Sequence, residues 1–395
     1  MKRILIIGAL PASLVNFRGP LLEALSANGH TVYAAVNGRD ANTEAKLKGM
    51  GVEYCPIRIA RTGMNLLADL VTLFDMFQLI NRIKPDVVLS YTIKPVIYGG
   101  IAAWLCGVRS IYSLITGLGY AFMDGAPFLV RWLAKVLYRA SLYHSCRVFF
   151  QNPDDKSMFI NMGILDQDKA VLVNGSGVDL FFFSFADINS KHDLASRQIR
   201  FLLIARLLRD KGICEYAEAA SIVKHKYPQV EFHLVGEFDP NPAGLRPEEV
   251  RAWESEGLIC FQGQQMDVRP FLRDCHVYVL PSFYREGIPR TVLEAMSMGR
   301  AVITTDAPGC RETVKQTIGT SECSAEQNNM NLKIGLNGIL VPVKNVKALV
   351  SAMEFFIKHP NQIEIMGKES RAYAEERYDV HKVNDVIIRE MGLGK

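Results

Sequence analysis

Apolar runs with the character of buried strands alternate with helical patterns along most of the chain. In the first part these apolar runs occupy residues 3–10, 30–37, 86–92, 110–116 and 147–152. Helical patterns at 16–29 and 65–84 lie between them. Nearly continuous apolar strands that alternate with helices are typical of a parallel sheet covered on both faces. We therefore predict that the chain begins with a doubly wound α/β domain.

A polar segment at 174–198, rich in Asn, Ser, Gly and Asp, interrupts this alternation. Apolar runs then resume at 199–206, 230–238, 258–263, 277–282 and 301–307. We predict two Rossmann-like domains, residues 1–190 and 191–376, and a final helix at 377–395 that packs back on the first domain. Since ligands of such sheets bind at the carboxyl ends of the strands, two facing domains predict one shared cleft. The polar stretch 316–335 has no period and is predicted to be a surface loop.

The charge of the chain is unevenly distributed. Residues 1–150 carry 16 Lys and Arg against 8 Asp and Glu, a net charge of +8, whereas the remainder carries 29 against 33, a net charge of −4. A basic half indicates an anionic partner, such as a phosphorylated substrate or a membrane surface. Nucleic acid is disfavoured, because the total charge is only +4 and no binding motif is present. The eight cysteines include no C-x-x-C pair, so neither a disulfide framework nor a metal site is expected.

The hydrophobic segments are short. No apolar run reaches the roughly 18 residues that a membrane-spanning helix needs. The apolar part of MKRILIIGAL is also short for a signal peptide and fits a buried strand better. We therefore expect a protein that is made and kept in the cytosol.

The stretch REGIPRTVLEAMSMG (285–299) holds two glutamates, Glu286 and Glu294. Glu286 follows the predicted strand at 277–282, and Pro289 suits the first turn of a helix that ends at Gly299. Glu294 then lies about one and a half turns into that helix. Carboxylates beside the open backbone N–H groups of a helix start form a binding corner for a polyol such as a sugar or ribose. The alternative is a helix-terminal charge and a surface ion pair.

The stretch IARLLRDKGI (204–213) supplies two cations near a strand end. Arg206 ends the strand and Lys211 opens the next helix, so both point toward the same edge as Glu286. An Arg and a Lys at a helix start can neutralise a pyrophosphate. The alternative is a pair of solvated charges. A Walker lysine motif and a G-x-G-x-x-G motif are both absent from the sequence, which disfavours an ATPase and a dinucleotide-dependent dehydrogenase.

These motifs, together with HLVGEFDPNP and NGILVPVKN, resemble glycosyltransferase family 4 in order and spacing. The segments VLSYTIKPVIYGGIAA (88–103) and ITGLGYAF (115–122) are similar to the branch that acts on polyprenyl-diphosphate-linked acceptors. The resemblance covers nearly the whole chain. It implies an α/β protein of the GT-B fold, in which two Rossmann-like doubly wound domains face each other across a cleft. It also implies an enzyme that transfers sugars with retention at the anomeric carbon.

The resemblance also implies roles for individual residues. Glu286 would contact the hydroxyls of the donor sugar, Glu294 would accept the ribose hydroxyls, and Arg206 with Lys211 would hold the leaving diphosphate. The backbone at Gly236, Gly287, Ile288 and Pro289 would help to position the donor. No metal is expected, since Arg and Lys can offset the leaving-group charge. No general base is assigned, because Thr116–Gly117 and Tyr91–Thr92 stand where many relatives carry a histidine.

The acceptor side has weaker candidates. Arg18 and Lys94 are candidate ligands of an acceptor pyrophosphate, and Thr116 and Gly117 are candidate acceptor contacts, although each of the charges could simply be solvated. The segment 127–150 places Arg131, Lys135 and Arg139 four residues apart beside Trp132 and other apolar side chains. This composition is typical of an interfacial helix on an anionic membrane, and the alternative is a domain helix with a basic rim. Tyr120 and Phe122 are candidates for stacking on a ligand or for the core.

We therefore predict a retaining transferase at the cytoplasmic face of the membrane. The donor would be a UDP-sugar, with UDP-N-acetylgalactosamine first by resemblance, and the acceptor an undecaprenyl-diphosphate-linked saccharide of a surface polysaccharide or glycan. One alternative is a nucleotide-sugar epimerase of the same fold, which needs no acceptor and no membrane helix. Another is a non-catalytic protein that binds sugar nucleotides.

Overall fold

The computed structural model describes residues 1–59, 65–119, 122, 127–188, 198–241, 243–316 and 332–394. Tyr120 and most of the predicted surface loop at 316–335 lie outside these residues. The chain divides into two compact units. Unit 1 comprises Met1–Gly177, Arg285–Ile288 and Val380–Lys395, and unit 2 comprises Val178–Tyr284 and Pro289–Asp379.

The boundary between the units differs from the predicted one at residue 190, since unit 1 ends at Gly177. The residues that follow belong to unit 2 because they bond to it. The Val178 N–H donates to the Tyr378 carbonyl at 2.7 Å, and the Ser297 hydroxyl donates to the Phe183 carbonyl at 2.6 Å. The polar composition of this segment did not reveal those bonds.

Unit 1 is built on a parallel sheet in the order β3-β2-β1-β4-β5-β6-β7. Its strands are β1 (Arg3–Ile7), β2 (Thr31–Asn37), β3 (Val52–Ile57), β4 (Val87–Tyr91), β5 (Ser110–Ile115), β6 (Arg147–Phe150) and β7 (Ala170–Leu172). Its helices are α1 (Pro11–Ala27), α2 (Ala41–Gly49), α3 (Leu66–Ile83), η1 (Pro95–Gly99), α4 (Gly100–Leu105), α5 (Phe128–Leu142), α6 (Pro153–Asn161), η3 (Gln167–Lys169) and α15 (Val380–Glu390).

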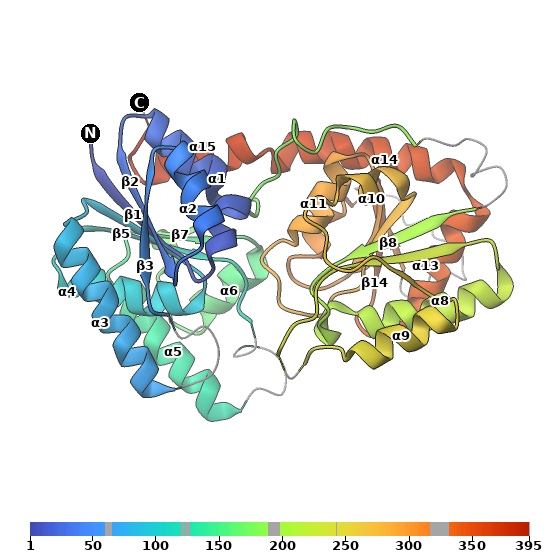
Figure 1. The fold of residues 1–395 in the computed structure, drawn as a ribbon, viewed down its shortest axis with the longest axis horizontal. Helices are drawn as coiled ribbons and strands as arrows, with labels where there is room; N and C mark the ends of the chain where they lie inside the picture. Colours follow the sequence, from blue (N-terminus) through green and yellow to red (C-terminus); the bar gives the residue numbers. More distant parts are fainter. Residues whose placement is uncertain are drawn as a thin grey trace. The chain divides into compact units, whose positions relative to one another are not determined.

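Helices cover both faces of this sheet (Figure 1). Ile4 and Ile6 of β1 share a core with α1 and α15, whereas Leu5 and Ile7 share one with α3 and α4. Because neighbouring side chains of a strand point to opposite faces, burial on both faces explains the continuous apolar runs. α5 packs on η1 and α4, on the same side as α3. The final helix is tied to the sheet where the Tyr112 hydroxyl donates to the Met391 carbonyl at 3.2 Å.

Unit 2 repeats this plan in the order β10-β9-β8-β11-β12-β14-β13, with β13 antiparallel. Its strands are β8 (Arg200–Ile204), β9 (Glu231–Val235), β10 (Cys260–Phe261), β11 (Val277–Leu280), β12 (Ala301–Thr305), β13 (Lys333–Ile334) and β14 (Gly338–Val341). Its helices are η4 (Arg209–Lys211), α8 (Ile213–Lys226), α9 (Pro247–Ser255), α10 (Arg269–Asp274), α11 (Arg290–Ser297), η5 (Arg311–Thr313), α13 (Val346–Lys358), α14 (Asn361–Tyr373) and η6 (Ala374–Tyr378).

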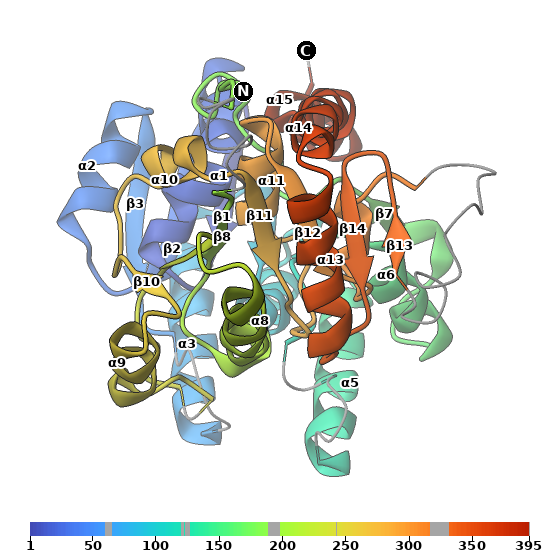
Figure 2. The same cartoon turned by 90° about the vertical axis from the view of Figure 1, so that its right-hand side faces the viewer.

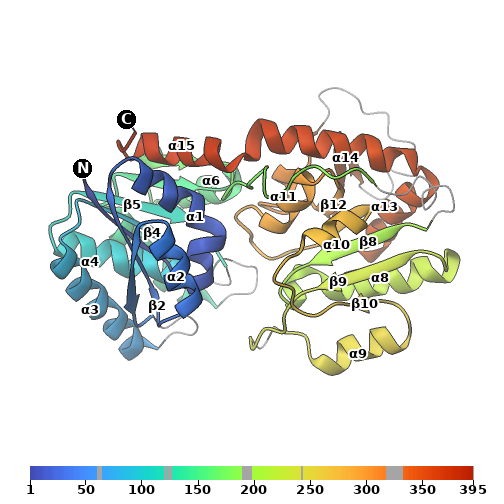
Figure 3. The same cartoon turned by 45° about the horizontal axis from the view of Figure 1, so that its top comes forward.

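The unit 2 sheet also lies between two helical layers. α8 and α13 pack against each other on one face, and Figure 2 shows them together in front of the strands. α11 and α14 contact each other and β12 on the other face, as Figure 3 shows. All ten apolar runs quoted above form strands. The strands outside those runs, β3, β7, β13 and β14, include three edge strands, which are short or interrupted by polar residues and proline and so carry a weak apolar signal.

The strand order fixes where ligands are expected. In unit 1 the order of the strands reverses between β1 and β4, and in unit 2 it reverses between β8 and β11. At such a switch point the connections leave the sheet in opposite directions, and a crevice opens outside the carboxyl ends of the two strands. The residues that follow β8 and β11 are therefore the first place to look for a ligand site in unit 2.

Candidate active site

Arg206 and Gly236 lie beside the switch point of unit 2, just after β8 and β9. The Arg206 guanidinium donates to the Asp239 carboxylate at 2.6 Å, and 41% of the Arg206 side chain remains exposed. A Cβ atom at Gly236 would lie 1.8 Å from the Ala205 carbonyl oxygen. The two strand ends therefore approach too closely for a side chain at Gly236, while Arg206 stays partly open to a ligand.

Lys211 lies on the short turn η4, directly before α8. The loop after β11 holds this turn, since the N–H groups of Phe283 and Tyr284 donate to the Asp210 carbonyl at 2.9 and 3.0 Å. The Lys211 ammonium lies 5.4 Å from the centre of the Tyr284 ring. Lys211 and Arg206 thus come from the two ends of one connection, and the structure places both beside the switch point.

Glu294 lies on α11, which begins after Pro289 and ends before Gly299, as predicted. Its carboxylate accepts from the Arg290 guanidinium at 3.0 Å, and only 12% of its side chain is exposed. Burial raises the pKa of Glu294, and the nearby Arg290 partly offsets this effect. A carboxylate held out of water in this way is well suited to accept hydrogen bonds from ligand hydroxyls.

The segment Arg285–Ile288 belongs to unit 1, although the residues on both sides of it belong to unit 2. It lies against Thr116 and Gly117, which follow β5. Gly117 has a φ of +110°, and a Cβ atom there would lie 2.7 Å from the Arg285 carbonyl oxygen and 3.1 Å from the Glu286 carbonyl carbon. The structure therefore brings two predicted acceptor residues against the backbone that carries Glu286.

The sequence predicts an open backbone N–H at Ile288, and this prediction is wrong. The Ile288 N–H donates to the Gln151 side-chain oxygen at 3.3 Å, and Ile288 itself is buried. A Cβ atom at Gly287 would lie 1.9 Å from the same oxygen. Because the amide is used inside the protein, ligand contacts at this segment are expected from the Glu286 side chain instead.

Sequence reasoning missed Asn152, a fully buried residue at the start of α6. Its side-chain oxygen accepts from the Asp155 N–H at 2.8 Å, which caps the helix. Its side-chain nitrogen donates to the carbonyls of Glu286 and Gly287, both at 3.1 Å. The Asn-Pro pair directly after a strand is a helix-start signal, but no local pattern links it to residues more than a hundred positions later.

The candidate acceptor residues Arg18 and Lys94 lie in different surroundings in unit 1. Arg18 is 1% exposed, and its guanidinium carbon lies 5.2 Å from the centre of the Tyr91 ring at the end of β4. The Lys94 ammonium donates to the Asp69 carboxylate at 2.6 Å, and both side chains are mostly buried. Lys94 would have to leave this ion pair to bind an acceptor, so its predicted role stays a prediction.

The predicted membrane helix is α5. Its Phe128 and Trp132 side chains are 82% and 51% exposed, while Tyr138 and Leu142 face the core. Arg131 and Lys135 are half-buried and Arg139 is exposed on the basic side of the helix. Phe122 is 4% exposed and packs against Tyr138 and Phe159, so it belongs to the core.

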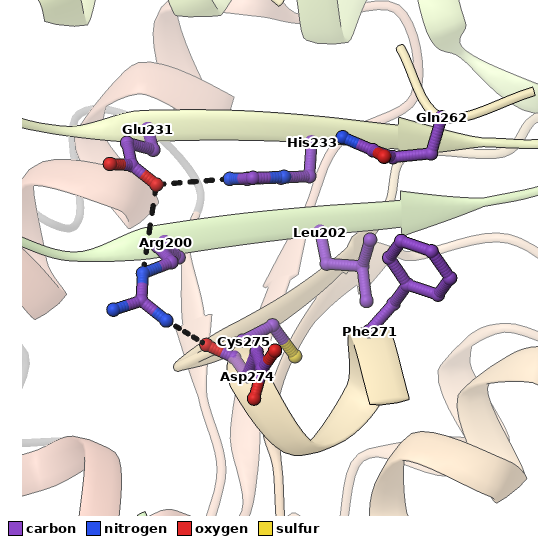
Figure 4. A pocket seen from close by; sticks show the side chains of 8 residues that line it. All are labelled: Arg200, Leu202, Glu231, His233, Gln262, Phe271, Asp274 and Cys275. Carbon is purple, nitrogen blue, oxygen red and sulfur yellow. Dashed lines mark hydrogen bonds and ion pairs between the residues drawn. The ribbon is translucent and has the colours of Figure 1, made fainter. Parts of the chain in front are cut away.

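A pocket of about 320 Å³ opens elsewhere in unit 2 (Figure 4). It is lined in part by Arg200 and Glu231, the first residues of β8 and β9, and thus starts at the amino ends of the strands. Its charged groups bond to one another: Glu231 lies 3.6 Å from the Arg200 guanidinium and 3.1 Å from the His233 ring nitrogen. The pocket is therefore separate from the predicted donor residues at the carboxyl ends.

Two further observations concern metals and membranes. In the part of the chain that the structure describes, no three His, Cys, Asp or Glu side chains come together as metal ligands. Among the described helices, none combines the length and the apolar composition needed to cross a membrane. The expectation of metal-independent chemistry stays a prediction.

Two protein families match the chain in succession. A glycosyl transferase 4-like domain matches residues 18–175, and the glycosyl transferases group 1 match residues 198–359. The N,N'-diacetylbacillosaminyl-diphospho-undecaprenol alpha-1,3-N-acetylgalactosaminyltransferase of Campylobacter jejuni is 29% identical, over 77% of this chain and 80% of that protein. The UDP-Gal:alpha-D-GlcNAc-diphosphoundecaprenol alpha-1,3-galactosyltransferase of Escherichia coli is 25% identical, over 82% of this chain and 79% of that protein.

Solved structures are similar over almost the full length. HepE of Anabaena, in complex with UDP and glucose, has a TM-score of 0.74 at 18% identity and covers 99% of this chain and 100% of that one. The sucrose-phosphate synthase of Thermosynechococcus elongatus also has a TM-score of 0.74 at 18% identity, with 98% of each chain covered. These similarities, together with the two parallel sheets, confirm the fold class predicted from the sequence.

Proposed function

The chain is a glycosyltransferase of the group 1 and 4-like families, and we propose that it transfers a sugar from a UDP-sugar to a saccharide linked to undecaprenyl diphosphate. N-acetylgalactosamine is the first choice of sugar, because the similar Campylobacter enzyme is named for its transfer. The observation that supports the proposal is that Arg206, Lys211 and Glu294 all lie on segments that follow β8 or β11, the two strands of the switch point of unit 2.

The donor residues divide the nucleotide sugar between them. Arg206 and Lys211 bind the diphosphate and offset the negative charge that grows on it as the bond to the sugar breaks. Glu294 accepts the ribose hydroxyls. Glu286 contacts the sugar hydroxyls near the carbon that is transferred. The reaction retains the anomeric configuration, and the leaving phosphate takes the proton of the acceptor hydroxyl. Two carboxylates astride the bond, as in hydrolytic glycosidases, are not used here.

The acceptor binds to unit 1. Thr116, Gly117 and Arg18 all lie near the carboxyl edge of the unit 1 sheet, where such a sheet binds ligands. A guanidinium such as that of Arg18 suits an anionic diphosphate. The polyprenyl chain of the acceptor lies in the membrane, so the same edge of unit 1 should also face the membrane surface.

The test is a donor screen. Purified protein is incubated with UDP-N-acetylgalactosamine, UDP-N-acetylglucosamine, UDP-galactose or UDP-glucose and a short-prenyl diphosphate saccharide. We expect transfer from one of these donors and the α-configuration in the product. An epimerised nucleotide sugar that forms without acceptor would support an epimerase instead. Binding without turnover across the whole panel would support a non-catalytic protein.

Two helices support contact with an anionic membrane. α3 exposes Leu67, Leu70, Val71 and Phe74, which lie along one face at helical spacing. α5 exposes Phe128, Leu129, Trp132 and Val136 beside its basic row. Each helix follows a parallel strand of the same sheet, so both begin at its carboxyl edge. An exposed apolar stripe flanked by Lys and Arg, as on α5, is typical of a helix that lies in an anionic lipid interface, and α3 adds apolar surface without a basic flank.

Reversal of the basic row should release the protein from membranes. The variant with Arg131, Lys135 and Arg139 replaced by Glu is expected to stay in the supernatant when anionic liposomes are sedimented, while the wild type pellets. The matched control replaces Arg39, Lys46 and Lys48 by Glu and so changes the net charge equally. These exposed residues lie just before α2 or within it, on the other face of the sheet. Equal sedimentation of wild type and the α5 variant would contradict membrane docking through α5.

A further inference from the structure

The Glu286 segment belongs to unit 1, whereas the residues at both of its ends belong to unit 2. Before it, Phe283 and Tyr284 donate their N–H groups to Asp210 within unit 2. After it, Pro289 begins the unit 2 helix α11. The residues between them, Arg285–Ile288, bond to unit 1. A short strap with this arrangement has few ways to move unless its unit 1 bonds open.

The bonds to unit 1 come from a small set of buried side chains. Asn152 donates to the carbonyls of Glu286 and Gly287, which belong to the two peptide units after the Glu286 Cα. Arg285 lies 3.2 Å from the Asp155 carboxylate and also donates to the Phe122 carbonyl at 3.4 Å. The Asp155 side chain is 1% exposed and that of Arg285 is 18% exposed. The two peptide units after Glu286 and the side chain of the residue before it are thus bonded to other parts of unit 1.

We propose that Asn152, Asp155 and Arg285 form a clamp that positions the Glu286 carboxylate for sugar transfer. The three are positioning residues, because they act through the backbone of Glu286 and do not contact the substrate. The inference rests on the proposed function for the role of Glu286, but the existence of the clamp does not. The clamp makes Glu286 part of the acceptor-binding unit, while Arg206, Lys211 and Glu294 belong to the other unit.

Asn152 makes more hydrogen bonds than a helix cap requires. The cap of α6 needs the Asn152 oxygen, which accepts from the Asp155 N–H. A serine can supply that oxygen equally well. The Asn152 nitrogen serves the Glu286 and Gly287 carbonyls and the Asp155 carboxylate, which lies 3.0 Å away. A serine at this position therefore keeps the cap and removes the clamp bonds.

The Asp155 carboxylate is buried away from water, which disfavours its ionised form. Burial raises the pKa of Asp155 to about 6, and Asn152 and Arg285 offset this only in part. The ionisable groups around it are Arg285, the neighbouring Asp154 and the buried Tyr138. A raised pKa means that the ionised carboxylate destabilises the fold relative to the protonated one. The stability contributed by this group is present below the ordinary pKa and is lost as the pH rises through about 6. A buried charge kept despite this cost indicates a role in geometry.

The first test separates the clamp from the cap. Asn152→Ser should keep the cap and lower the melting temperature only through the loss of the buried bonds to Glu286 and Gly287, while the amides of residues 286–288 exchange with deuterium faster. The kcat should fall about 10- to 100-fold, because small misplacements of a reacting group have effects of this size. The KM for the UDP-sugar should change little, since the diphosphate and ribose residues are in unit 2. Asp40→Ser, at the cap of α2, is the control and should change neither exchange at 286–288 nor kcat.

The second test uses pH. In the wild type, kcat should decline as the pH falls through about 6, because the protonated Asp155 no longer holds Arg285. In Asp155→Asn this decline should be absent and kcat should be low at every pH. The melting temperature of Asp155→Asn relative to wild type should be higher at pH 8 than at pH 5, by the sign given above. If Asp155 merely stabilised the fold, its replacement by Asn would lower both the melting temperature and kcat.

The outcomes of these tests decide whether the clamp exists and whether it positions Glu286. Unchanged exchange at residues 286–288 in Asn152→Ser would overturn the clamp itself, whether or not the enzyme is active. Faster exchange with wild-type kcat would overturn its positioning role. If the wild type transferred no sugar from any donor of the screen, the proposed function would fail, and the exchange data would still decide whether the clamp exists.

Discussion

Replacement of Glu286 by Ala should lower kcat by about 100- to 1,000-fold, with the UDP-sugar still bound. The nucleotide contacts in unit 2 remain in this variant, so the donor KM should change much less than kcat. The lost interaction is one that strengthens as charge develops on the transferred sugar, and such interactions contribute to turnover more than to binding. The measurement is a steady-state titration of donor at saturating acceptor, with UDP-sugar affinity determined by calorimetry.

The control for this variant is Glu248→Ala. Glu248 lies on α9, is 68% exposed and pairs with Arg251 at its surface. Its removal should leave kcat and KM near those of the wild type, because exposed ion pairs contribute little. Turnover of Glu286→Ala within a few-fold of the wild type would remove Glu286 from the site.

Replacement of Lys211 by Met should lower kcat by about 100-fold or more. Methionine keeps most of the side-chain volume but removes the charge, and with it the contact of the ammonium with the Tyr284 ring. Without that cation the leaving diphosphate is less stabilised in the transition state. Arg206→Met is expected to act in the same direction, and it also leaves the Asp239 carboxylate without its guanidinium partner.

A neighbouring residue provides a close control for Lys211. Arg209 lies in the same turn, but its guanidinium binds the Glu249 carboxylate at 2.6 Å. This ion pair holds the pKa of Glu249 down to about 2. Arg209→Met should therefore change kcat little. Equal effects of Arg209→Met and Lys211→Met on kcat would contradict a specific role of Lys211. The loss of kcat would then come from the total positive charge of the turn and not from binding of the diphosphate by Lys211.

The position of the ligand edge followed from the sequence because it depends on local order. Strand, turn and helix succeed one another at Arg206 and Lys211, and again at Glu286 and Glu294. In a parallel sheet this order alone sends the polar residues to the carboxyl edge. The same local patterns predicted the start of α11 at Pro289 and its end before Gly299. Of the edge strands in the described sheets, β3, β7 and β13 escaped prediction, because a strand with one neighbour and one exposed side needs fewer apolar residues.

The partners of the Glu286 segment could not be predicted in this way. The Ile288 amide looks open in the sequence, since nothing nearby can accept from it, but the side chain of Gln151, just after β6, accepts from it. The same holds for Arg285, whose partner is the buried carboxylate of Asp155 in α6. These pairs are far apart in the chain and leave no spacing or period behind. Only the folded sheet brings their side chains together.

By itself, the sequence determined the two doubly wound sheets, the family and the polar residues that follow the carboxyl ends of the strands. These features are set by periodicity and by neighbours a few positions apart, and both can be read along the chain. The tertiary structure decided that Glu286 belongs to unit 1 and that Asn152, Asp155 and Arg285 bond to its segment and to one another there. It also decided that α3 adds a second exposed apolar stripe beside that of α5. Such features depend on which surfaces of distant segments are buried against each other, and burial is a property of the folded chain.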